Sequence, residues 1–402
     1  MLVLADALER MRREVPLRPV EWTPPAGALG RVVAADIPAP RDLPPFDNSA
    51  MDGYAVRAAD TAGARPEAPV GLRVLGSCAA GQVFAGEVGP GTCVRVFTGS
   101  VLPAGADAVI MQEDTAVDPA RPGEVRLLDA ARPWENVRFR GEDVKQGTPV
   151  LRAGDRLNAL RLGLLAALGL DRVATRRPPV VGLLATGSEL LEPGQPWEPG
   201  RIFESNRLTL TPLVARTGAI PRLYPLVPDT LAATRAALEQ AFADCDAVLT
   251  TGGVSVGELD FVKAAFADLG GTTEFWKVAI RPGKPFVFGR HQDRFLFGLP
   301  GNPVSAVVTF LLLVRPLLLH WQGATDTDLP AHPGVLAEPL ANHGDRRHFL
   351  RVVLEPGGAV RPAGAQNSHL LGSLARANGL VDVPPHTTWP SGTAVTVLAI
   401  DP

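Results

Sequence analysis

The feature that most constrains the fold of this chain is the regular alternation of two kinds of segment between residues 178 and 322. Short apolar runs such as PVVGLLAT (179–186) and DAVLTT (246–251) are typical of buried strands, and SNRLTLTPLVARTG (205–218) is typical of a helix that stops at glycine. Alternating strands and helices favour a parallel sheet that is covered on both faces. We therefore predict a doubly wound α/β/α domain over residues 177–325.

The other elements of this domain follow from the same patterns. RLYPLV (222–227) predicts a strand, and Asp229 is placed to cap the next helix. Asn302 and Pro303 predict the cap and the first residue of the last helix. The remaining predictions are a helix over 258–271 and short strands at 286–289 and 295–298.

The three segments that flank this domain differ from it in composition and in residue pattern. Residues 41–144 are rich in Gly and Pro and contain short alternating runs, so we predict a β-rich second domain. Residues 326–402 contain three strand-like runs and predict a small C-terminal β-barrel or sandwich. Residues 1–40 and 145–176 are expected to form a helix-containing linker domain, with an amphipathic helix at the N-terminus and a second helix that stops near Gly169.

Composition excludes several classes of protein. A formal net charge of −3 on 402 residues gives no strong attraction to nucleic acid or to an anionic membrane. The three cysteines have no metal-ligand spacing, so we expect buried thiols. The run VVTFLLLVRPLLL (307–319) is interrupted by Arg315-Pro316 and is expected to be too short to span a bilayer. With no signal-like N-terminus, these features predict a cytoplasmic protein.

Acidic side chains follow three of the predicted strands. Ligands of doubly wound sheets bind beyond the carboxyl ends of the strands. Glu189, Asp229 and Asp260 would meet there, beside the Gly252-Gly253 turn, where backbone can approach an anion. Carboxylates beside a phosphate cradle suit Mg²⁺. The alternatives remain a simple turn at the glycines, a helix cap at Asp229 and a first-turn helix acid at Glu189.

Basic side chains crowd the segment FWKVAIRPGKPF (275–286). Lys277, Arg281 and Lys284 are held close together by the tight Arg-Pro-Gly-Lys turn, which suits a substrate with several negative charges; a solvated surface cluster is the alternative. The histidines His343, His348 and His369 do not form a metal-binding pattern, and we expect surface or packing roles for them. No G-x-S-x-G elbow or Walker loop is present.

The stretch PPFDNSAMDGYAV (44–56) matches neither a strand pattern nor a helix pattern. It is too polar for a core strand and too rich in Asn, Asp and Gly for a helix, so we predict an ordered loop. Its apolar residues Phe46, Met51, Tyr54 and Val56 are expected to anchor that loop, and Asp52 is expected to face a site.

The motifs together resemble the molybdopterin molybdenumtransferase family, which includes the MoeA proteins and the gephyrin E domain. The resemblance spans the chain and rests on eight motifs in order: FDNSAMDGYAV, FTGSVLPAGADAVIMQED, RFRGEDVKQG, LLATGSEL, SNRLTL, TTGGVSVGELDF, FWKVAIRPGKPF and GLPGNPVSA. It implies an elongated linker domain and a homodimer whose site is shared between subunits. It also implies molybdenum insertion, in which molybdate and adenylylated molybdopterin react with Mg²⁺ and AMP is released.

The resemblance also implies roles for residues of this sequence. The implied catalytic residues are Asp52, Thr98, Asp143, Glu189, Asp229, Asp260, Lys277 and Arg281. Glu189, Asp229 and Asp260 would bind or orient Mg²⁺. The implied substrate-binding residues are Thr186, Gly187, Ser188, Gly252, Gly253, Ser255, Lys284, Pro300 and Pro303. Arg281 departs from the family, which commonly has Lys there, so a planar fork replaces a point charge.

Two rival functions follow from the same sequence. The α/β domain also resembles the adenylyltransferase that makes the adenylylated intermediate, although the flanking domains favour the insertase. A non-enzymatic scaffold is the second rival, since fused relatives cluster receptors. By resemblance, the adenylyltransferase and molybdenum enzymes are expected partners of an insertase.

Overall fold

The computed structural model describes residues 1–254 and 261–400. The chain divides into two compact units. The larger unit comprises Met1–Ala35, Ala153–Leu162 and Arg172–Pro402, and the smaller unit comprises Asp36–Arg152 and Gly163–Asp171. Ser255 and Asp260, which the sequence placed in the site, lie outside the described residues. The division into four domains remains a prediction.

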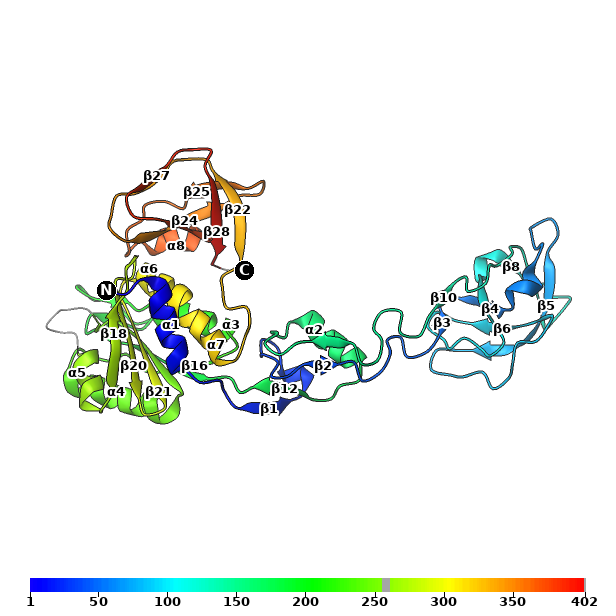
Figure 1. The fold of residues 1–402 in the computed structure, drawn as a ribbon, viewed down its shortest axis with the longest axis horizontal. Coiled ribbons are helices and arrows are strands. Elements are labelled where there is room, and N and C mark those ends of the chain that lie inside the picture. The colour runs from blue at the N-terminus through cyan, green and yellow to red at the C-terminus, as the bar shows by residue number, and fades with distance from the viewer. Residues whose placement is uncertain (255–260, 401–402) are drawn as a thin grey trace. The chain divides into compact units, whose positions relative to one another are not determined.

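A six-stranded sheet forms the centre of the larger unit (Figure 1). In spatial order the strands are β16 (Ile220–Leu223), β13 (Val180–Ala185), β17 (Ala247–Thr251), β21 (Arg294–Leu299), β20 (Pro285–His291) and β18 (Thr272–Lys277). The first four of these strands are parallel, β20 runs antiparallel to β21, and β18 runs antiparallel to β20. The predicted doubly wound architecture is confirmed, with one antiparallel strand inside it.

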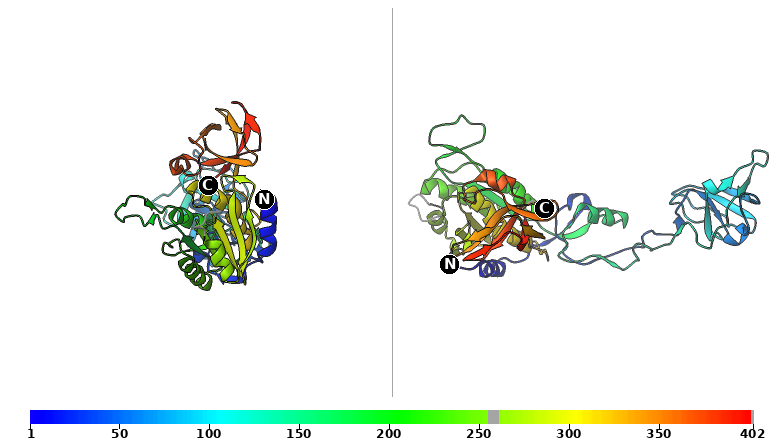
Figure 2. Two further views of the ribbon diagram at one scale, coloured as in Figure 1. Left: turned by 90° about the vertical axis from the view of Figure 1, so that its left-hand side faces the viewer. Right: turned by 90° about the horizontal axis from the view of Figure 1, so that it is seen from above.

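Helices cover both faces of this sheet because successive strand residues point to opposite sides. Leu183 and Leu249 belong to the core cluster of one face, whereas Leu184 and Val248 belong to that of the other. The first face is covered by α1 (Leu4–Glu14), α3 (Asn206–Arg216), α6 (Pro303–Thr309) and α7 (Arg315–Trp321), and the second by α4 (Leu231–Asp244) and α5 (Val262–Asp268). The left view of Figure 2 shows α1, in blue, alongside strands of this sheet.

Before α4 the structure corrects the bounds of one predicted strand and the identity of one predicted helix cap. The strand predicted over 222–227 is β16, which begins at Ile220 and ends at Leu223, before Pro225. The cap of α4 is Thr230, whose side chain accepts a hydrogen bond from the Ala233 amide. Asp229 therefore does not cap the helix, and its carboxylate remains available at the carboxyl edge of the sheet.

The helix that contains the apolar run near residue 310 continues past Arg315-Pro316, so the prediction that this run is too short to span a bilayer is wrong. α6 continues through a π-helical turn at Phe310–Val314 into α7. Pro316 lacks the amide that an α-helix would use at this point, and a wider turn accommodates that loss. The stretch Pro303–Trp321 is long and apolar enough to cross a membrane by length and composition, but 89% of its apolar window is buried inside the fold.

A closed barrel follows this helix in the chain. Its strands are β24 (Arg347–Leu354), β25 (Ala359–Pro362), β22 (Ala331–Leu336), β28 (Ala394–Ala399) and β26 (Gly379–Val383), and pairing of β26 with β24 closes the ring. The short β19 (Ile280–Arg281) pairs with β24. Associated with the barrel are α8 (Leu371–Arg376) and the pair β23 (Leu340–Asn342) with β27 (Thr387–Trp389). The barrel alternative of the sequence prediction is confirmed.

The smaller unit contains a six-stranded sheet of its own. Its strands in order are β7 (Ala108–Met111), β4 (Gly53–Val56), β6 (Thr92–Val96), β5 (Val70–Cys78), β9 (Glu124–Leu127) and β8 (Thr115–Ala116). β4 lies inside the stretch that we predicted to be a loop, and all four of its residues are buried. The loop prediction is therefore wrong there, because flanking Asn, Asp and Gly residues mask a short central strand. Phe46 and Met51 are exposed and do not anchor the segment.

The remaining elements are short. They are the pairs β1 (Val20–Thr23) with β12 (Val173–Arg176), β2 (Ile37–Pro38) with β11 (Pro149–Leu151), β3 (Asn48–Ser49) with β10 (Val137–Arg138) and β14 (Leu190–Leu191) with β15 (Ile202–Phe203); helix α2 (Ala159–Ala167); and 3₁₀ turns at Pro25–Gly27, Ala58–Thr61 and Gln112–Asp114. All three cysteines are buried and free, as predicted.

Candidate active site

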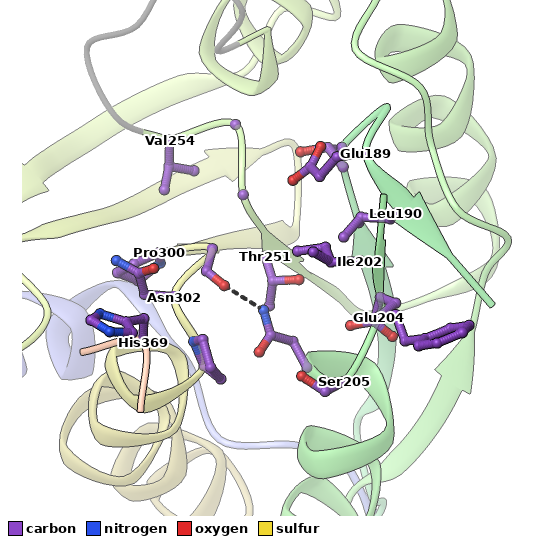
Figure 3. A pocket seen from close by; sticks show the side chains of 18 of the residues that line it. Glu189, Leu190, Ile202, Glu204, Ser205, Thr251, Val254, Pro300, Asn302 and His369 are labelled. Carbon is purple, nitrogen blue, oxygen red and sulfur yellow. Dashed lines mark hydrogen bonds between the residues drawn. The ribbon is translucent and has the colours of Figure 1, made fainter. Parts of the chain in front are cut away.

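A cavity of about 680 Å³ lies at the carboxyl ends of β13, β17 and β21 (Figure 3). We call it the acid-lined cavity. Its lining comes from the segments that follow the three strands, from residues 202–206, from Asp229 and from His369 and Leu371 near α8. Of the predicted site residues, the lining includes Thr186, Gly187, Glu189, Asp229, Gly252, Gly253, Pro300 and Pro303. The edge of the sheet at which we predicted ligand binding therefore does carry a cavity.

Two glycines bring the β17 loop close to the β13 loop. Gly252 and Gly253 have φ values of +85° and +66°, which side-chain-bearing residues rarely adopt. A Cβ atom at Gly252 would lie 2.6 Å from the Thr186 carbonyl oxygen. The Gly252 amide donates to the Leu299 carbonyl at 3.2 Å, so this amide serves the fold. The glycine pair thus permits close packing of three loops. Because the Gly252 amide already has a backbone acceptor, it is not free to donate to an anion.

Glu189 and Asp229 supply the acidic character of the cavity. Glu189 lies in a turn before β14, which excludes the alternative of a first-turn helix acid. Asp229 Oδ2 accepts a hydrogen bond from the Ser188 amide at 2.8 Å, and Ser188 Oγ accepts one from the Asp229 amide at 3.0 Å. Ser188 therefore holds Asp229 in place and does not itself line the cavity.

The donor set fits a hard cation in part. Mg²⁺ in proteins commonly binds through one or two carboxylates, with water and phosphate oxygens completing the octahedron. Glu189 and Asp229 can supply two carboxylates to one cavity. Within residues 1–254 and 261–400, no group of three or more acidic, histidine or cysteine side chains converges to hold a metal. Glu204 also lines the cavity, but its carboxylate is already paired with Arg207.

Three threonine hydroxyls at this edge have no hydrogen-bond partner among the described residues. They belong to Thr186, Thr250 and Thr251, and all three oxygens are buried. Thr186 and Thr251 also line the acid-lined cavity. Buried hydroxyls are normally paired, so unpaired ones beside a cavity are suited to a polar ligand.

Buried charges fix the wall of the cavity that residues 202–206 form. Figure 3 shows Glu189 and Glu204 on one side and Pro300, Asn302 and His369 on the other. Glu204 is 3% exposed, and its Oε2 accepts a hydrogen bond from Arg207 Nε at 3.0 Å. Across the cavity, Asn206 donates to the Gly301 carbonyl at 2.8 Å. These contacts hold the 202–206 segment against the loop that follows β21.

The predicted basic cluster does not line this cavity. Lys277 ends β18 and its ammonium lies 4.5 Å from the centre of the Trp276 ring. Arg281 is exposed and belongs to β19, which joins the barrel sheet. Lys284 is also exposed, and Pro285, the next residue, does line the cavity. The basic cluster therefore precedes a lining residue in the sequence, but none of its three side chains lines the cavity.

In the smaller unit, the structure brings together two of the three predicted residues. Asp52 Oδ1 accepts hydrogen bonds from both the amide and the hydroxyl of Thr98, each at 2.8 Å. The Thr98 amide, and then its hydroxyl, lower the pKa of Asp52. Asp143 is exposed, and its amide donates to the Leu43 carbonyl at 3.1 Å. Asp52 is thus held as an anion on the turn that precedes β4.

Three family models match this sequence in order. They are the MoeA N-terminal region (domain I and II) over residues 2–169, the probable molybdopterin binding domain over 182–320 and the MoeA C-terminal region (domain IV) over 333–400. The molybdopterin molybdenumtransferase of Haemophilus influenzae is 38% identical over 384 residues, which cover 94% of this chain and 93% of that protein. The chain belongs to the MoeA family.

Further relatives agree with this assignment. Molybdopterin molybdenumtransferase 2 of Mycobacterium tuberculosis is 41% identical over 375 residues, 91% of each chain. The crystal structure of a molybdopterin biosynthesis MoeA protein from Pyrococcus horikoshii OT3 has a TM-score of 0.80 at 33% identity, covering 99% of this chain and 100% of that chain. This MoeA protein is accordingly a transferase with a role in molybdenum cofactor biosynthesis.

Sequence reasoning missed several residues that line the site of this MoeA protein. His369 and Leu371 come from the C-terminal region, far from the α/β motifs, and His369 was expected to have only a surface or packing role. Asn302 was interpreted as a helix cap, yet its side chain makes no cap bond and donates to Ser368 Oγ at 3.2 Å. Glu204 precedes the motif SNRLTL and was not considered. No local pattern marks such residues, because tertiary contacts between distant segments place them.

Proposed function

We propose that this MoeA protein transfers molybdenum from molybdate to adenylylated molybdopterin, with Mg²⁺-dependent release of AMP. The observation that carries the proposal is the acid-lined cavity, in which Glu189 and Asp229 lie beside glycine-lined loops. An adenylylated phosphate would approach those loops, and a cation held by the two carboxylates would offset its charge. The residues proposed to hold Mg²⁺ are Glu189, Asp229 and Asp260.

The proposed reaction balances without an oxidant or a reductant. Two thiols of the pterin form Mo–S bonds as two oxygens leave molybdate as hydroxide, so molybdenum stays hexavalent. Water adds to the phosphoanhydride, which splits into AMP and the phosphate monoester of the cofactor. Neither step needs a protein nucleophile, so the proposed work of the protein is positioning and charge stabilisation.

Further roles follow from the positions of the remaining residues. Lys277, Arg281 and Lys284 are proposed to attract the anionic reactants toward the cavity through the field of the cluster. Thr186, Gly187, Ser188, Gly252, Gly253 and Ser255 are proposed to contact the phosphate region, directly or through Asp229. Pro300 and Pro303 are proposed to shape the facing loop.

We also propose a homodimer in which Asp52, Thr98 and Asp143 of one subunit complete the site of the other. The hydrogen bonds from Thr98 keep the Asp52 carboxylate ionised and oriented, which suits a shared charged site. Mixing Asp52→Asn subunits with Asp229→Asn subunits tests this idea, because only a mixed dimer can assemble one intact site. Activity that stays at the level of the parent variants at every mixing ratio would count against a shared site.

The central experiment measures AMP release from adenylylated molybdopterin by the purified protein. Release is expected to require both molybdate and Mg²⁺ and to stop when Mg²⁺ is chelated. Release that is independent of molybdate would overturn the insertase proposal. Adding ATP and bare molybdopterin separates the adenylyltransferase rival, for which pyrophosphate would appear. The adenylyltransferase and molybdenum enzymes remain proposed partners, and the cytoplasm the proposed location.

A further inference from the structure

A second cavity of the larger unit combines guanidinium groups with an apolar floor. It has a volume of about 220 Å³ and lies where α3, the π-helical turn and the end of the barrel meet. Three arginines supply the charge: Arg156 and Arg315, which are partly buried, and Arg216, which is exposed. The apolar surface comes from Leu213, Phe310, Leu311 and Leu329. We call it the arginine cavity. None of its lining residues belongs to the acid-lined cavity.

Arg156 and Arg315, the two partly buried arginines of this cavity, make only backbone hydrogen bonds with the described residues. Arg156 Nη2 donates to the Arg216 carbonyl at 2.5 Å, while its buried Nε has no partner there. Arg315 Nη1 donates to the Thr327 carbonyl at 2.8 Å. Neither guanidinium forms an ion pair with a described carboxylate. Both side chains are only partly exposed, so water compensates their charge incompletely.

The pKa shifts of Arg156 and Arg315 also show that their positive charges are incompletely compensated. Burial lowers the pKa of Arg315, and the positive charge of Arg156 lowers it further. Burial also lowers the pKa of Arg156, and the charge of Asp326 offsets part of that effect. Asp326 and Asp328 act in the opposite sense on Arg315, but both are exposed and neither is paired with it. Two partly buried like charges beside one cavity create a site that an anion would stabilise.

The backbone at this cavity is irregular as well. Phe310 and Leu311 belong to the π-helical turn, and Arg315 is the first residue of α7 after it. Such single π turns are frequent at functional sites because they turn side chains out of the regular helical register. Here the turn presents two apolar side chains and is followed directly by a guanidinium, all facing one cavity.

We propose that the arginine cavity binds a small oxyanion ligand, a phosphate or carboxylate group with an apolar remainder that rests on Phe310 and Leu311. Arginine forks match the planar oxygen pairs of both groups. A volume of about 220 Å³ is below the roughly 300–1,000 Å³ of pockets for drug-sized ligands, so a nucleotide or a pterin is too large. The site therefore differs in ligand from the acid-lined cavity, and it does not depend on the proposed reaction.

Calorimetric titration of the full-length protein at constant ionic strength tests the proposal. The probes are inorganic phosphate, phenyl phosphate and benzoate, with chloride as the reference ion. Phenyl phosphate is expected to bind about tenfold more tightly than inorganic phosphate, because its ring covers apolar surface. The relative affinities of phenyl phosphate and benzoate distinguish a phosphate from a carboxylate site. Heats identical to those of chloride for all three probes would refute the proposal.

Variants assign the binding to this cavity. Arg156→Gln and Arg315→Gln are each expected to weaken phenyl phosphate binding at least tenfold. Arg235→Gln is the matched control, since Arg235 is exposed and paired with Glu239 on the far side of α4, and it should bind as the parent does. Equal affinity in all variants, or an equal loss in the control, would overturn the assignment. If a glutamine variant does not fold, Arg315→Lys keeps the charge without the fork and should show an intermediate affinity.

Discussion

The acid-lined cavity and the arginine cavity lie along one helical stretch but are built by opposite means. Pro303, at the start of α6, lines the first, whereas Phe310, Leu311 and Arg315, further along, line the second. The first gathers carboxylates and glycines on loops at the ends of parallel strands. The second gathers guanidinium groups from packed segments that share no sheet edge. In the first cavity, Glu204 is paired with Arg207 and Asp229 accepts a hydrogen bond from Ser188. In the second, the described partners of Arg156 and Arg315 are backbone carbonyls.

This difference shows how a fold can treat buried arginine in two ways. Arg207 behind the acid-lined cavity is 5% exposed, and it contacts Glu204, Glu192 and the Tyr224 carbonyl. Arg315 has a single described backbone acceptor, the Thr327 carbonyl. A buried charge with complete partners serves the structure, whereas one with incomplete partners is available to a ligand.

The largest expected effect compares these two arginines directly. Arg207→Met should destabilise the protein by about 3–5 kcal/mol, because it leaves the buried Glu204 carboxylate without its partner. Arg315→Met should change stability by about 1 kcal/mol or less, because a lost backbone hydrogen bond is offset by relief of repulsion from Arg156. Urea unfolding of both variants measures the difference. Equal losses would mean that Arg315 is as fully compensated as Arg207.

The next effect concerns the acids of the first cavity. Glu189→Gln and Asp229→Asn should each reduce Mg²⁺-dependent AMP release by about 10²–10³-fold, the usual cost of removing one group that stabilises developing charge. The amide oxygen of the Asp229→Asn variant can still accept the Ser188 hydrogen bond, so unfolding should shift little. Steady-state assays over a range of Mg²⁺ concentrations measure the loss, with the exposed Glu198→Gln as the matched control. Full activity in both variants would remove the cation from the proposal.

The same contrast explains what the sequence could and could not reveal. Glu189, Asp229 and the glycine pair each follow a recognisable strand, and the rule for parallel sheets brings such positions together. Arg156 and Arg315 lie far apart in a chain that is rich in arginine, and only packing unites them. β4 escaped prediction because four buried residues are too short a run to outweigh the Asn, Asp and Gly around them. Site residues at the ends of strands can be predicted from sequence patterns, whereas contacts between segments that are distant in the chain cannot.

The arginines around His348 form a third charged region, and this region makes the stability of the protein depend on pH. His348 is 5% exposed, and neither ring nitrogen has a partner among the described residues. Burial, followed by the charges of Arg281, Arg351 and Arg346, lowers the pKa of His348 to about 4. The unfolded chain therefore binds the proton near pH 6.5, where the folded chain does not.

His348 should thus make the protein less stable as the pH falls from about 6.5 to about 4, by about 3 kcal/mol in total. His348→Leu should flatten that part of the stability profile, as measured by urea unfolding at several pH values. The exposed His332→Leu serves as the control and should leave the profile unchanged. A parent profile that is already flat over this interval would show that an anion or a rearrangement compensates the arginines around His348.

The smallest expected effect separates loop geometry from loop chemistry in the acid-lined cavity. Gly252→Ala and Gly194→Ala place a methyl group at similar positive φ angles, +85° and +93°, so both carry a similar backbone cost of about 1–2 kcal/mol. At Gly252 the new Cβ would also lie 2.6 Å from the Thr186 carbonyl oxygen, whereas at Gly194 it would meet no atom within 4 Å.

The difference between the two alanine variants therefore isolates the close approach of the β17 and β13 loops. Gly252→Ala should be less stable than Gly194→Ala by about 1–3 kcal/mol, the usual cost of overpacking, and it alone should also lose AMP release. Thermal unfolding and the AMP assay measure both quantities in the same samples. If Gly252→Ala lost stability but kept full activity, the glycines would serve packing alone, and the anion would have to be held by the carboxylate-bound cation and the unpaired threonine hydroxyls.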